Sequence, residues 1–114
     1  VSIEQLQENL RKRRENDSSI NILPAAQADI FQAIDWYDSC QPGLGRNFET
    51  EVLRMLRVIA EFPKVHARID MKFRRAVIQE FPYIVVYRNG QTAVDILAVF
   101  PTHMNPDRLQ GRLG

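Results

Sequence analysis

Three arginines and two tyrosines gather in the sixteen residues from Phe73 to Arg88, and these side chains are well suited to recognition or chemistry. Arg74 and Arg75 are adjacent, and Tyr83 and Tyr87 lie in a second strand-like run. Guanidinium groups bind phosphates and carboxylates through charge-assisted hydrogen bonds, often in pairs. The segment therefore predicts a surface that suits nucleic acid or an acidic protein.

The charge of the chain is unevenly distributed. The formal net charge is +1, but residues 21–63 carry 3 basic and 6 acidic side chains, whereas residues 64–114 carry 8 basic and 4 acidic ones. A basic half is an electrostatic footprint for phosphate or an acidic partner. Solvated charge scattered over the surface is an equally good explanation of the count alone.

The period of a strand limits which of these side chains can act together. Neighbouring residues on a strand point to opposite faces of the sheet. Arg74 and Arg75 therefore cannot both line one site, whereas Tyr83 and Tyr87 share a face with Val85. The two tyrosines are as well suited to packing as to stacking on a partner.

Several kinds of site find no support in the sequence. Cys40 is the single cysteine, and no Cys/His spacing typical of a metal site occurs, so we expect neither a metal nor a cofactor. The glycines of Gln41–Gly45 lack a phosphate-binding pattern and predict a turn. No apolar run of about 18 residues and no secretory signal is present, which favours the cytoplasm and no association with membranes.

The elements that position the arginines and tyrosines are predicted strands. Turn residues separate strand-like runs over Arg74–Glu80, Tyr83–Arg88 and Thr92–Phe100, which predicts three consecutive antiparallel strands. The last run is apolar at successive positions, so we expect the sheet to be buried on much of both faces. Residues 64–72 read as an irregular, polar connector.

A helical hairpin is predicted before the strands. A short strand over Ile20–Leu23 ends at Pro24, and helical spacing of apolar residues follows over Ala25–Ser39 and again until Pro63. Together with the strands this predicts an α+β domain, a helical hairpin packed on a small antiparallel sheet. Trp36 or Tyr37 should be largely buried where the first helix meets its neighbours.

The first residues form a separate unit in this interpretation. Ser2–Glu15 has a capping-box start and a thin apolar stripe, which predicts an amphipathic helix tethered by a polar linker. We therefore divide the chain into residues 1–19 and a domain of residues 20–114. The helix either docks on its own domain as a built-in inhibitor or pairs with a second copy to form a homodimer.

The ordered elements and several short sequence motifs resemble the RelE/ParE superfamily of bacterial toxins, in particular its ParE-like, plasmid-stabilisation branch. The resemblance covers about residues 22–106. The segments that carry it are Ala33–Tyr37, Pro42–Phe48, Arg74–Val77, Phe81–Tyr83, Val86–Arg88 and Ile96–Phe100. The resemblance implies the toxin of a type II toxin–antitoxin module, held inactive by a cognate antitoxin.

Members of the superfamily act in two ways, and these imply different site residues. RelE-like members cut messenger RNA on the ribosome. This reaction needs side chains that stabilise the charge of the transition state and side chains that transfer protons. The corresponding candidates here are Arg74, Arg75, Tyr87, His103 and Arg108. Relatives often carry an arginine pair where this chain has His103 and Met104, a departure that weakens the nuclease interpretation.

ParE-like members block DNA gyrase by binding it, and we favour this mode. The target-binding candidates are then Arg74, Arg75, Tyr83, Arg88 and Arg108. An inactive relative that serves as a binding module is a third alternative. Whether the protein is an enzyme is left open by the sequence.

Overall fold

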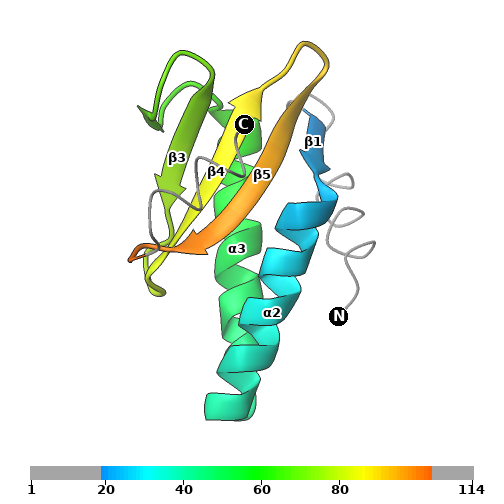
Figure 1. Cartoon of the computed structure of the whole chain (residues 1–114), viewed down its shortest axis with the longest axis vertical. Coiled ribbons are helices and arrows are strands. Elements are labelled where there is room, and N and C mark those ends of the chain that lie inside the picture. The colour runs from blue at the N-terminus through cyan, green and yellow to red at the C-terminus, as the bar shows by residue number, and fades with distance from the viewer. Residues whose placement is uncertain (1–18, 104–114) are drawn as a thin grey trace.

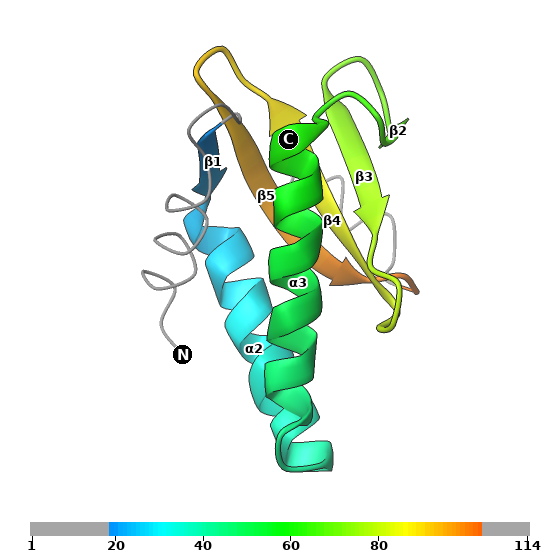
Figure 2. The same ribbon diagram turned by 180° about the vertical axis from the view of Figure 1, so that it is seen from behind.

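The structure, a computed structural model, describes residues 19–103. The predicted helix Ser2–Glu15 and the candidate Arg108 lie outside the described residues. Within them the chain forms two helices and a five-stranded sheet. The elements are β1 (Ser19–Ile22), α2 (Pro24–Cys40), α3 (Leu44–Glu61), β2 (Ala67–Arg68), β3 (Phe73–Val77), β4 (Tyr83–Asn89) and β5 (Ala93–Pro101). Figures 1 and 2 show both helices on one face of the sheet.

The helical hairpin follows from local breakers in the sequence. Pro24 begins α2, where its missing N–H costs nothing and its fixed φ suits the helix. Gly43 begins the turn into α3 with a φ of 90°, a conformation that other residues adopt only with strain. Helix α3 ends at Glu61, two residues before Pro63. The predicted hairpin over residues 24–62 is thus confirmed.

The sheet has the order β1-β5-β4-β3-β2. Strands β3, β4 and β5 form the predicted antiparallel meander. The expected antiparallel sheet is wrong in one respect, because β1 pairs with β5 in parallel, with Ile20 opposite Val94. A parallel pair needs a long crossover connection. The helical hairpin and the meander supply that connection, so the sheet is mixed.

The connector of residues 64–72 is more ordered than its composition indicates. Ala67 and Arg68 form β2, which pairs with Arg75 and Arg74 of β3. The carboxylate of Asp70 accepts hydrogen bonds from the backbone N–H groups of Lys72 and Phe73, at 2.8 and 2.9 Å. This side-chain cap closes a tight turn that folds the connector back onto β3.

Both faces of the sheet carry apolar clusters, as predicted from β5. The larger cluster lies between helices and sheet and includes Phe48, Val85 and Tyr87. A smaller one, centred on Val86, Ala98 and Phe100, lies on the opposite face. The register between β4 and β5 shifts, so that Tyr87 faces Ile96 while Val86 faces Ala98. This irregularity moves Ala98 to the face opposite Ile96, which strict alternation would not predict.

Of the two aromatic residues near the C-terminal end of α2, Trp36 and Tyr37, Tyr37 is the one that contacts the core. Its ring stacks on Phe48 with centroids 5.4 Å apart and meets Phe81 edge-on at 4.8 Å. Trp36 is 61% exposed. The sequence predicted that Trp36 or Tyr37 would be largely buried, and the structure shows Tyr37 partly buried against the core.

Replacing Tyr37 with alanine should lower the free energy of unfolding by about 2 to 4 kcal/mol, because ring contacts are lost and a cavity forms. The Trp36→Ala variant should stay within about 0.5 kcal/mol of the parent, since that side chain is mostly in solvent. Urea denaturation of both variants measures the difference. Equal effects of the two substitutions would contradict the packing described here.

Candidate functional site

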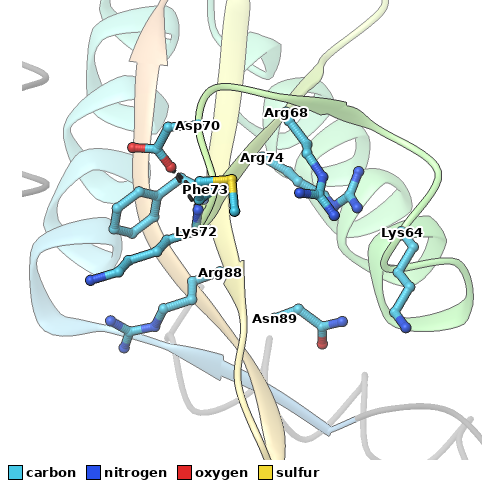
Figure 3. Close-up of a pocket in the computed structure, with 9 residues that line it drawn as sticks. Lys64, Arg68, Asp70, Lys72, Phe73, Arg74, Arg88 and Asn89 are labelled. Carbon is cyan, nitrogen blue, oxygen red and sulfur yellow. Dashed lines mark hydrogen bonds between the residues drawn. The ribbon is translucent and has the colours of Figure 1, made fainter.

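A group of basic side chains surrounds a pocket of about 310 Å³ at one end of the sheet. We call the five cations that line it the basic cluster: Lys64, Arg68, Lys72, Arg74 and Arg88. They come from the segment after α3 and from β2, β3 and β4. Asp70 is the one acidic residue in the lining, and its carboxylate caps the turn at Lys72. Figure 3 shows these cations in two groups, with Arg68, Arg74 and Lys64 on one side and Lys72 and Arg88 on the other.

Two arginines of the basic cluster are direct cross-strand neighbours. Arg68 on β2 pairs with Arg74 on β3 in the antiparallel register, and Figure 3 shows both side chains at the pocket. Like charges that are directly opposite on neighbouring strands destabilise a sheet. An anion held between the two guanidinium groups would relieve this repulsion. The pair is therefore well placed to bind a phosphate or carboxylate group.

The members of the basic cluster differ in how far they are already engaged. Arg74 donates to the backbone oxygen of His66 at 2.7 Å. Arg88 forms an ion pair with Asp95 at 2.6 Å, and its hydrogen bond is the main cause that lowers the pKa of that carboxyl. The side chains of Lys64, Arg68 and Lys72 make no hydrogen bond or ion pair with any residue in the range 19–103. Within residues 19–103, nothing therefore engages the charges of these three side chains.

Tyr87, a candidate nuclease residue, is buried and has a structural role here. It has no exposed surface, and its hydroxyl donates to the backbone oxygen of Pro63 at 2.9 Å. The hydroxyl also lies 3.3 Å from Nδ1 of His66. Burial raises the pKa of Tyr87, and burial together with the nearby Arg74 lowers the pKa of His66. Tyr87 thus anchors the segment that carries Lys64 and does not reach the pocket.

The other predicted site residues do not converge on the basic cluster. Arg75 pairs with Val86 and lies on the opposite face of the sheet from Arg74, as strand alternation predicts. Tyr83 begins β4 and packs edge-on against Phe48 at 4.9 Å. His103 follows β5 at the Tyr83 end of the sheet, since Pro101 pairs with Tyr83. Along β4 this end is about 20 Å from Arg88.

Sequence reasoning missed Lys64, Arg68 and Lys72 as site residues. All three lie in or beside the connector that was interpreted as irregular. The excess of basic residues after residue 63 was the available signal. The excess of basic residues does not reveal the turn at Asp70, which places Arg68 opposite Arg74.

The described residues offer little for metal binding or membrane insertion. In the range 19–103, no three or more histidine, cysteine, aspartate or glutamate residues are grouped so as to hold a metal ion. Neither helix of that range has the length and apolar character needed to span a membrane.

Comparison with known proteins gives relatives in sequence and in structure. No protein-family model matches the chain. Toxin ParE2 of Mycobacterium tuberculosis, in strains CDC 1551 / Oshkosh and ATCC 25618 / H37Rv, is 28% identical over 86 residues, which covers 75% of this chain and 82% of the relative. A solved structure described as the chromosomal ParDE TA system from P. aeruginosa contains a chain with a TM-score of 0.67 and 15% identity. The match covers 74% of this chain and 95% of that one.

Both matches cover about three quarters of this chain. The fold of two helices on one face of a small sheet is shared with the solved chain, and the similarity in sequence extends over three quarters of the protein. These observations agree with the resemblance carried by the short motifs. The chain thus resembles toxin ParE2 in sequence and shares its fold with a chain of the solved ParDE system.

Proposed function

We propose that this protein is the toxin of a type II toxin–antitoxin module and arrests growth in the cytoplasm by binding a protein target such as DNA gyrase. The proposal is supported by the similarity to toxin ParE2 and by the solved ParDE fold. A cognate antitoxin would neutralise it. The site that we assign to the target is the basic cluster.

The observation that carries this assignment is the opposition of Arg68 and Arg74 across β2 and β3. Two cations that lie directly opposite each other on neighbouring strands do not stabilise a sheet. An external anion that binds both is the simplest explanation of their position. Lys64 and Lys72 add two further cations without partners in the described chain. A protein surface rich in carboxylates fits this arrangement through charge-assisted hydrogen bonds.

The nuclease alternative has less support from the geometry. Its candidate Tyr87 is buried and its candidate His103 is at the far end of the sheet from Arg74. A general acid or base must lie within hydrogen-bond reach of the reacting group. The described residues therefore bring together cations for binding but not the acid–base set predicted for cleavage.

Expression of the full chain from an inducible promoter in a bacterial host tests the proposed function. Growth should stop on induction, the DNA-damage response should rise, and supercoiling by purified gyrase should fall when the protein is added. Messenger RNA should stay intact in the same cells. Arrest with rapid messenger cleavage and normal gyrase activity would favour the RelE-like alternative, and unimpeded growth at high protein level would favour an inactive relative.

A further inference from the structure

A second pocket lies at the far end of the helical hairpin and has the opposite charge. Its volume is about 470 Å³, and both helices line it. Asp35 and Asp38 of α2 and Glu49 of α3 contribute carboxylates, whereas Arg46 is the single cation in the lining. Helix α3 is about 27 Å long, given the rise of 1.5 Å per residue, and this pocket lies at its start, whereas Lys64 follows its end.

Glu49 is the unusual member of this group because its carboxylate is buried with one oxygen unpaired, although the nearby charge of Arg46 offsets part of the cost of burial. The residue is only 9% exposed, and its Oε2 atom is buried and accepts no hydrogen bond from any residue in the described chain. Burial raises the pKa of this carboxyl. A buried carboxylate is stable only when it is paired and hydrogen-bonded. Oε2 of Glu49 therefore remains able to accept a hydrogen bond from a further cation in this pocket.

The close approach of the two helices fixes these acidic groups in place. Oδ1 of Asp38 accepts a hydrogen bond from the backbone N–H of Gly45 at 2.8 Å. A Cβ atom at Gly45 would lie 2.6 Å from the backbone oxygen of Ile34, so only glycine permits this crossing. Asp38 therefore interacts with the positive end of the α3 dipole. Asp35 and Glu49 remain to bind a ligand.

We propose that this pocket binds a lysine or arginine side chain of a partner polypeptide, with Glu49 as the buried counter-ion. The charged group would reach Glu49, and Asp35 would contact it from the rim. Phe31 and Ile34 line the same pocket and offer apolar surface for the aliphatic stem. The excess of acidic side chains in residues 21–63 favours a cationic occupant over an anionic one.

A titration of the full chain with two model side chains tests the site without reference to toxicity. The probes are lysine and norleucine, each blocked as Nα-acetyl N-methylamide, because norleucine has a similar stem without the charge. Saturable NMR shifts at the amides of Gly43 and Gly45 are expected with the lysine probe alone. Equal shifts with both probes, or none with either, would overturn the proposal.

The Glu49→Gln variant should bind the lysine probe about tenfold more weakly or worse, since one partner of a buried charge pair is lost. Glu80→Gln, an exposed change in the turn between β3 and β4, is the matched control and should bind as the parent does. Asp35→Asn provides a second test at an exposed position should Glu49→Gln fold poorly. Unchanged binding in both pocket variants would place the cation elsewhere.

The dependence of melting temperature on pH gives an independent measure of Glu49. A raised pKa in the folded state means that stability falls as the pH rises through that pKa. The charged groups that line the pocket with Glu49 are Asp35 and Asp38 on α2 and Arg46 on its own helix. Glu49→Gln should therefore melt higher than the parent at pH 7 and at the same temperature at pH 3. Equal melting at both values would show that the carboxylate is already compensated.

Discussion

Reversing two charges of the basic cluster, in an Arg68→Glu/Lys72→Glu variant, is expected to abolish growth arrest while the protein stays folded. Both side chains are exposed and make no hydrogen bond or ion pair within residues 19–103. Each charge-assisted contact with a partner is worth about 1.5 to 3 kcal/mol. Loss of two such contacts weakens binding about a hundredfold or more, and the glutamates add repulsion.

The control for this variant is Arg75→Glu, an exposed charge reversal that lines neither pocket and lies on the face of the sheet opposite Arg74. Induced growth curves and circular dichroism compare the two proteins. A folded Arg68→Glu/Lys72→Glu protein that still arrests growth would move the target site elsewhere. Loss of arrest in both variants would point to net charge alone.

Replacing Phe48 with alanine is expected to lower the free energy of unfolding by about 3 to 5 kcal/mol. The ring has no exposed surface and lies at the centre of an aromatic cluster. It stacks on Tyr37 and meets Phe81 and Tyr83 edge-on, with centroids 5.3 and 4.9 Å away. Domains of this size have a total stability of about 5 to 15 kcal/mol, so the change removes a large part of it.

Thermal and urea denaturation measure this effect, and the melting temperature should fall by on the order of 20 °C. Phe62→Ala is the matched control, because Phe62 follows the same helix and is 51% exposed. It should cost less than about 1 kcal/mol. A Phe48→Ala protein as stable as the Phe62→Ala protein would show that the helices are not held to the sheet by this cluster.

Because local signals carry them, the elements of the fold other than β2 could be predicted from the sequence. Pro24 and Pro63 limit the helical hairpin, and Gly90 lies in the turn between β4 and β5. Proline and glycine residues that end an element, and hydrophobic periodicity, act over a few residues. They can therefore be recognised in the sequence without knowledge of the rest of the chain. The same holds for the opposite faces of Arg74 and Arg75, which follow from the period of a strand.

The candidate site could be predicted only in part. Arg74 and Arg88 were named from the sequence, and both line the pocket. Arg68 was not, because its role depends on pairing with Arg74 across a turn capped by Asp70. Tyr87 was assigned a functional role by its type, but its hydroxyl is engaged by Pro63, a residue 24 positions earlier in the chain.

The sequence by itself thus determined the kind and order of the elements and the basic character of the second half. Only the tertiary structure decided which polar groups remain without partners. Glu49 sits in an ordinary amphipathic helix pattern, yet the packing of α2 against α3 buries its carboxylate. Whether a buried polar group finds a hydrogen-bond partner depends on residues distant in sequence. The local periodicity of the sequence does not show those contacts.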